Sequence, residues 1–134
     1  MFDSWADIDT GGYSKFVALK SKNPQLKTMI AIGGWDDSLD GKYSILVSDS
    51  KNIAAFVQSV MGFLWQYKFD GLDLDWEYPT TPEDKIGFAN LITALREAFQ
   101  PMGYLLSAAV VCNAGKTDAG IVYNIKMNHH RVIY

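Results

Sequence analysis

Hydrophobic positions along the chain follow two patterns, one typical of helices and one typical of buried strands. In some segments apolar side chains recur every three or four residues, which predicts helices with one buried face. Between these segments lie short apolar runs, which predict strands covered on both faces, as in parallel sheets. The predicted elements are a helix over 13–21, a strand over 27–32, a helix capped by Ser50, a strand over 69–76, a helix starting at Thr81 and a strand over 104–111.

The order of these elements predicts an α/β fold with a parallel sheet. The predicted strands begin at residues 27, 69 and 104, so their starts lie 42 and 35 residues apart, as expected for strand–helix–strand units. Thr81 gives the third helix a strong start, because this capping residue is followed by Pro82 and two acidic residues. An open doubly wound sheet and a (β/α) barrel both satisfy this order, and periodicity does not distinguish them.

Composition supports a folded core and narrows the classes of partner. Hydrophobic residues make up 49% of the 134 residues, and the net charge of -3 gives no electrostatic case for nucleic-acid binding. No apolar run approaches the ~20 residues needed to span a bilayer, so no membrane partner is expected. The single cysteine, Cys112, excludes an internal disulfide and is expected to be a buried small side chain, whereas His129 and His130 are expected to be solvated.

One predicted strand carries a row of carboxylates. Side chains alternate between the faces of a strand, so Asp73, Asp75 and Glu77 share one face at roughly 6.6 Å per two-residue step. The apolar positions between them are Leu72, Leu74 and Trp76. Three neighbouring carboxylates within a sheet are costly unless they are protonated, paired or metal-bound. Packing alone would favour Val or Ile at these positions, so the row indicates a function.

Two other interpretations of the acidic residues are weaker. A solvated sheet edge does not require large apolar side chains on the other face of the strand. A Mg²⁺ or Ca²⁺ site remains an alternative, but ligands on one straight strand rarely surround an ion without help from elsewhere. The acidic segment that begins at Asp36 resembles a calcium loop only superficially, because its twelfth position is Val47 rather than Glu.

A catalytic role fits the row better. Adjacent carboxyls cannot all ionise easily, so one pKa is raised, and a carboxyl that stays protonated near neutral pH is a general acid. Glu77 is the last of the three and is followed by Tyr78, which in a barrel places it at the carboxyl-terminal rim. Asp75 projects from the same strand as Glu77, so it is poorly placed to attack a glycosidic bond from the opposite side. The nucleophile could come from another strand or from the substrate.

Residues 69–79, FDGLDLDWEYP, resemble position for position the signature of glycoside hydrolase family 18, the chitinases. Asp70 and the three carboxylates of the row supply its Asp-x-x-Asp-x-Asp-x-Glu pattern, and Gly71 is the motif residue that follows Asp70. Residues 27–35 are similar to the third-strand motif of the family, and residues 106–110 to its fifth strand. The resemblance covers roughly residues 2–120, whereas residues 121–134 diverge. It therefore implies that residues 1–134 are one fragment of a family 18 catalytic domain, a partial (β/α)8 TIM barrel with about three parallel strands.

The resemblance implies hydrolysis of β-1,4-linked N-acetylglucosamine polymers without a cofactor or a metal ion. Glu77 would protonate the glycosidic oxygen, and the acetamido oxygen of the substrate would attack the anomeric carbon with net retention. Asp75 would hold the acetamido N–H and stabilise the oxazolinium ion, and Asp73 would share a proton with Asp75. The expected partners are chitin or chito-oligosaccharides, and the expected location is extracellular, although the N-terminus does not resemble a signal peptide.

Aromatic residues beside the motif are candidates for sugar binding. The resemblance implies that Trp35 and Tyr78 line the cleft, since aromatic faces suit the apolar C–H face of a sugar ring. Other positions that match the family's cleft are Gly33, Gly34 and Asp36, and more weakly Ser4 and Trp5. Trp76 is expected to be a core residue, because its position in the alternation directs it toward the helices.

The sequence departs from the family pattern in length. A barrel of this kind typically has ~250 residues, and only the third, fourth and fifth strands of the family are matched. Exposed strand edges and an uncovered inner face predict marginal stability and poor chitinase activity for this chain alone. A non-catalytic chitin-binding lectin on the same fold is the alternative. The terminal Glu is typically lost in such lectins, so the presence of Glu77 favours an enzyme.

Overall fold

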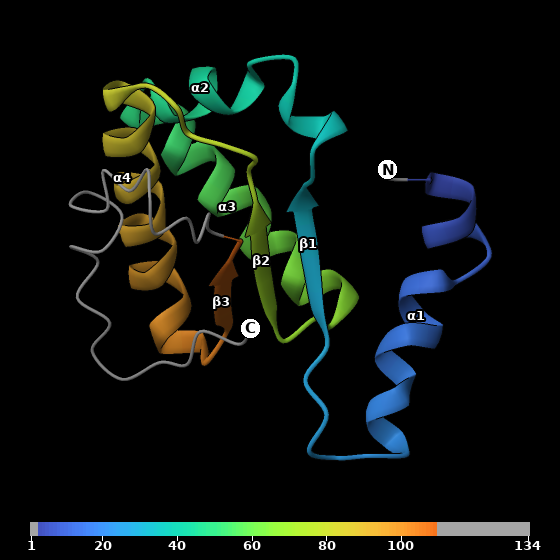
Figure 1. Ribbon diagram of the computed structural model, residues 1–134. Helices are drawn as coiled ribbons and strands as arrows, with labels where there is room; N and C mark the ends of the chain where they lie inside the picture. Colours follow the sequence, from blue (N-terminus) through green and yellow to red (C-terminus); the bar gives the residue numbers. More distant parts are fainter. Residues whose placement is uncertain (1–2, 110–134) are drawn as a thin grey trace, which may run out of the picture.

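The computed structural model describes residues 3–109, in which three parallel strands form one sheet in the order β1-β2-β3 (Figure 1). The strands are β1 (Met29–Gly33), β2 (Gly71–Asp75) and β3 (Leu105–Ala108). β2 is the central strand, with Gly33 of β1 opposite Asp75 and Ser107 of β3 opposite Asp73. The predicted α/β fold is confirmed, although each described strand is shorter than the apolar run that predicted it.

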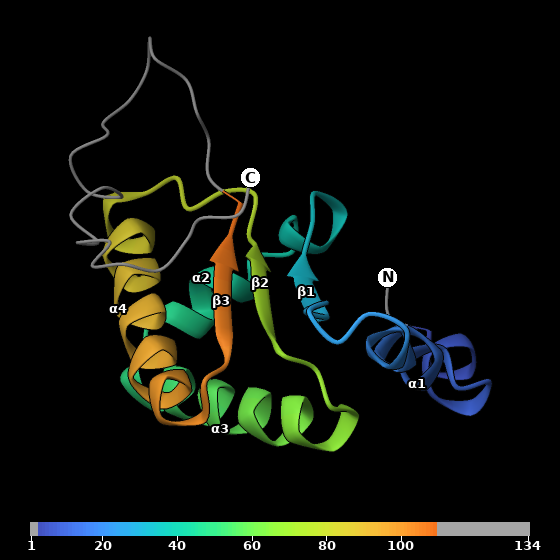
Figure 2. The same ribbon diagram turned by 90° about the horizontal axis from the view of Figure 1, so that it is seen from below.

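The helices that follow β1 and β2 cover one face of the sheet, whereas the first helix precedes β1 and lies beside it (Figure 2). The α-helices are α1 (Gly12–Val17), α2 (Lys42–Val47), α3 (Ser50–Tyr67) and α4 (Pro82–Phe99). Short π or 3-10 segments cover Trp5–Asp9, Ala18–Ser21, Asp36–Ser38 and Gln100–Met102. No helix in the described part of the chain is long and apolar enough to cross a membrane.

The helix starts show one confirmed prediction and one error. Thr81 caps α4 as predicted, because its hydroxyl accepts a hydrogen bond from the Asp84 amide at 3.0 Å. Ser50 does not cap α3. It is already helical, and the extended residue before it, Asp49, accepts the hydrogen bond from the Lys51 amide at 2.8 Å.

The core lies between the sheet and the helices. Leu72 and Leu74 of β2 are each 3% exposed and pack beneath α3 and α4, whose most buried side chains are Leu64, Leu91, Leu95 and Phe99. The sequence patterns did not predict α2, which packs against α4 at Gly87. A Cβ at Gly87 would lie 2.5 Å from Val47 Cγ2, so this glycine allows the two helices to approach.

Candidate active site

The carboxyl ends of β1 and β2 meet closely and position the candidate site. The Gly34 amide donates a hydrogen bond of 2.7 Å to the Asp75 carbonyl. Gly33 has a φ of 117°, and a Cβ there would lie 2.2 Å from the same carbonyl oxygen. The close approach of the strands therefore requires a glycine at position 33, and the φ of 93° at Gly34 favours a glycine there as well.

The carboxylates lie on the face of the sheet that the helices leave free. Asp73 and Asp75 are partly exposed and alternate with the buried leucines of β2, while Glu77 lies two residues beyond the end of the strand. Trp76 is 5% exposed, stacked on Tyr43 at 5.7 Å between ring centroids, with Phe88 at its edge at 5.9 Å. Its expected position in the core is confirmed.

The carboxylates of Asp73 and Glu77 affect the pKa of Asp75, which lies between them in the row. Partial burial, followed by repulsion from Glu77 and Asp73, raises the pKa of Asp75 above its ordinary value. Asp75 therefore keeps its proton to a higher pH than a free aspartate does. The hydroxyl of Ser107 donates a hydrogen bond to the Asp73 carboxylate from the neighbouring strand. The sequence places Ser107 in a strand motif but does not indicate this hydrogen bond, because the bond depends on the register between β2 and β3.

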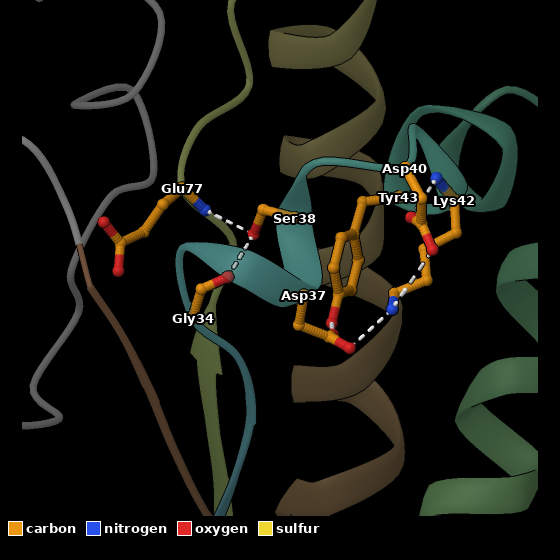
Figure 3. Close-up of polar contacts among 7 residues, drawn as sticks. All are labelled: Gly34, Asp37, Ser38, Asp40, Lys42, Tyr43 and Glu77. Carbon is orange, nitrogen blue, oxygen red and sulfur yellow. Dashed lines mark hydrogen bonds and ion pairs between the residues drawn. The ribbon is translucent and has the colours of Figure 1, made fainter. Parts of the chain in front are cut away.

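Hydrogen bonds join the turn after β1 to the residues that follow β2 (Figure 3). The hydroxyl of Ser38 accepts a hydrogen bond from the Glu77 amide at 3.0 Å and donates one to the Gly34 carbonyl at 2.8 Å. The sequence of this segment did not indicate a role for Ser38. No periodic pattern marks a hydroxyl that contacts backbone 39 residues away.

Exposed aromatic rings flank this edge of the sheet. Trp35 is 59% exposed and Tyr78 is 40% exposed, and Asp36 is also exposed. A hydrogen bond to Glu77 is the main cause that raises the pKa of Tyr78. The peptide bond between Glu77 and Tyr78 is cis. The structure thus brings Trp35 and Tyr78 to the same end of the sheet as the row of carboxylates.

Ser4 and Trp5 lie elsewhere. They are exposed and stand at the start of the π segment beside α1, on the side of β1 that faces away from β2 in both views (Figures 1 and 2). A hollow of about 1070 Å³ next to β1 is lined mainly by apolar side chains, and none of the three carboxylates lines it. The structure therefore does not bring Ser4 and Trp5 to the carboxylate row.

Asp70, the first acidic residue of the motif, anchors the other end of the sheet. Its carboxylate accepts hydrogen bonds from the Thr28 amide at 2.7 Å, the Thr28 hydroxyl at 3.1 Å and the Lys20 ammonium at 2.9 Å. Burial acts to raise the pKa of Asp70, but the contacts with Thr28 and Lys20 outweigh it and lower the pKa. Asp70 therefore stabilises the fold. The next residue, Gly71, allows β3 to approach closely, because a Cβ at this position would lie 2.2 Å from the Leu105 carbonyl oxygen.

Within residues 3–109, no three carboxylate, imidazole or thiol groups come together as a group that could hold a metal ion. Cys112, His129, His130 and the divergent segment 121–134 lie outside the described residues.

Comparisons with known proteins give a consistent result. The family model described as Glycosyl hydrolases family 18 matches residues 1–132. The chain is 47% identical over 127 residues to Probable chitinase 10 of Drosophila melanogaster, a match that covers 88% of this chain and 6% of the fly protein. It is 41% identical over 118 residues to the Endochitinase of Manduca sexta, covering 82% of this chain and 21% of that protein.

Solved structures agree with this match. Catalytic domain 2 of the Ostrinia furnacalis Group II chitinase is 47% identical, with a TM-score of 0.76, over 81% of this chain and 30% of that chain. A mutant of that domain was solved in complex with penta-N-acetylchitooctaose, (NAG)5. The Group IV chitinase of the same species, solved with allosamidin, is 38% identical, with a TM-score of 0.77 and the same coverage of 81% and 30%. The chain thus spans less than a third of each of these relatives and matches part of a (β/α)8 barrel catalytic domain.

Proposed function

Because the chain belongs to glycosyl hydrolases family 18, we propose that its carboxylate row hydrolyses β-1,4-linked N-acetylglucosamine polymers with the substrate's own acetamido group as nucleophile. The observation that carries the proposal is the placement of Glu77. It ends a row of three carboxylates on the free face of the sheet, next to the exposed rings of Trp35 and Tyr78. Chitin or chito-oligosaccharides are the proposed substrates, and an extracellular location is proposed with them.

In this mechanism Glu77 is the general acid. Its carboxyl proton passes to the glycosidic oxygen as the bond to the anomeric carbon breaks, and the acetamido oxygen forms the new bond to that carbon. The leaving sugar departs with the proton. Glu77, now a carboxylate, then takes a proton from the water that opens the oxazolinium ring, so the anomeric configuration is retained.

Asp75 would act on the acetamido group. Its raised pKa supports a role in which it holds a proton together with Asp73 and hydrogen-bonds the acetamido N–H as positive charge develops. Asp75 is the last residue of β2, and Glu77 follows it by two residues. This arrangement supports a nucleophile from the substrate rather than a second carboxylate opposite the acid.

The proposal is tested by turnover of a chito-oligosaccharide with a fluorescent leaving group. The wild-type chain should release the fluorophore more slowly than a full family barrel, because it matches three strands of one. Glu77→Gln should slow that release at least about 100-fold, while Glu97→Gln, at an exposed glutamate on α4, should not change it. Binding of the oligosaccharide by the wild type with no release of the fluorophore would favour the non-catalytic lectin instead.

A further inference from the structure

We propose that Ser38 is a positioning residue for Glu77, fixing the backbone beneath the general acid against the turn that carries Trp35. This inference rests on the proposed function of Glu77. The side chain of Ser38 lies behind the reacting face, so it would act through the Glu77 backbone and not on the substrate.

The hydroxyl of Ser38 both accepts and donates a hydrogen bond. It accepts the Glu77 amide at 3.0 Å and donates to the Gly34 carbonyl at 2.8 Å, and the Ser38 amide donates to the same carbonyl at 3.0 Å. One hydroxyl therefore joins the turn after β1 to the first residues beyond β2. Figure 3 shows the Glu77 amide facing Ser38 while its carboxylate points away from this turn.

This contact matters because Glu77 lies outside the strand ladder. The pairing of β1 with β2 ends at Gly33 and Asp75, and the Gly34 amide makes the next link to the Asp75 carbonyl. Two residues later the Glu77 amide donates to a side chain instead of a neighbouring strand. Without the Ser38 hydroxyl, this partly buried amide would lose the hydrogen-bond acceptor that it has in the described part of the chain.

The turn that carries Ser38 is itself held firmly. Next to Ser38, Asp37 accepts hydrogen bonds of 2.5 Å from both the Tyr43 hydroxyl and the Lys42 ammonium (Figure 3). Tyr43 is 5% exposed and stacks on Trp76, the residue directly before Glu77. The backbone of Glu77 is therefore fixed on one side by the Trp76 ring in the core and on the other by the Ser38 hydroxyl.

The first test separates the chemical step from substrate binding. A misplacement of about 1 Å can cost ~100-fold in rate, so Ser38→Ala should lower kcat about 10-fold to 100-fold and change KM less than about 2-fold. Ser38→Thr keeps the hydroxyl and should restore most of kcat. Ser48→Ala is the matched control, because the Ser48 hydroxyl donates to the Ile45 carbonyl at 2.8 Å in an exposed turn after α2. Its kcat should equal that of the wild type.

The second test does not depend on turnover. Amide hydrogen exchange, followed by NMR, should become at least about 10-fold faster at Glu77 in Ser38→Ala and stay unchanged in Ser38→Thr and Ser48→Ala. Unchanged exchange at Glu77 in Ser38→Ala would overturn the inference whether or not the chain hydrolyses its substrate. Faster exchange with an unchanged kcat, in a wild type whose turnover requires Glu77, would also overturn it and leave the proposed function standing.

Discussion

Replacement of Asp70 by Ala should destabilise the fold without acting on the chemistry. The Asp70 carboxylate accepts three hydrogen bonds, and two come from Thr28, which is 0% exposed. Removing the acceptor leaves the buried Thr28 amide without a partner, at a cost of ~1–3 kcal/mol. The partly buried ion pair with Lys20 adds roughly 1 kcal/mol. We therefore expect the free energy of unfolding to fall by about 3 kcal/mol.

The assay is urea denaturation at pH 7, followed by tryptophan fluorescence. Asp70→Asn keeps one carbonyl oxygen as an acceptor and should lose only about 1 kcal/mol, and the exposed control Asp9→Ala should change by less than about 0.5 kcal/mol. The pKa of Asp70 is lowered from its ordinary 3.8, so its stabilising effect is present above pH 3.8 and is lost as pH falls through the lower folded value. A loss for Asp70→Ala no larger than that for Asp9→Ala would refute the assigned role.

Three further predictions concern the site. Gly33→Ala should lower the free energy of unfolding by at least about 2 kcal/mol in urea denaturation, because the new Cβ would overlap the Asp75 carbonyl at a φ of 117°. Gly62→Ala, in the open interior of α3, should raise the free energy of unfolding by ~0.5–1 kcal/mol in the same assay. The pKa of Asp75 is raised from its ordinary 3.8, so Asp75→Asn should stabilise the fold at pH 7, and the gain should vanish below pH 3.8; a loss at pH 7 would contradict the repulsion inferred for the row. Trp35→Ala should weaken chito-oligosaccharide binding roughly 10-fold in calorimetry and leave the free energy of unfolding within about 0.5 kcal/mol, because Trp35 is 59% exposed.

Alternation along β2 was predictable because it is a local property of the strand. The two-residue period alone placed Trp76 in the core and Asp73 and Asp75 on the opposite face, and both placements are confirmed. The capping role of Thr81 was predictable for the same reason, since the cap, Pro82 and the amide it satisfies lie within four residues.

Features that depend on distant contacts were not predictable. The role of Asp70 follows from Lys20 and Thr28, which lie 50 and 42 residues away in sequence. Helix α2 has only six residues and no strong periodic pattern, and it packs at Gly87 on a helix that begins 35 residues after α2 ends. Ser38 and Ser107 carry no local signal. The partner of Ser107 is set by the register of β2 and β3, and the partner of Ser38 by the way the turn after β1 meets the residues after β2.

The most direct test of the central claim compares fluorophore release from a chito-oligosaccharide by the wild-type chain, Glu77→Gln and Glu97→Gln. General acid catalysis contributes typically 10²–10⁴-fold, so Glu77→Gln should lose at least about 100-fold in kcat, and Glu97→Gln should match the wild type. Circular dichroism of the three proteins should agree, because Glu77 lies beyond the end of β2 and Glu97 is exposed on α4. Release by Glu77→Gln at the wild-type rate would contradict the assignment of Glu77 as the general acid.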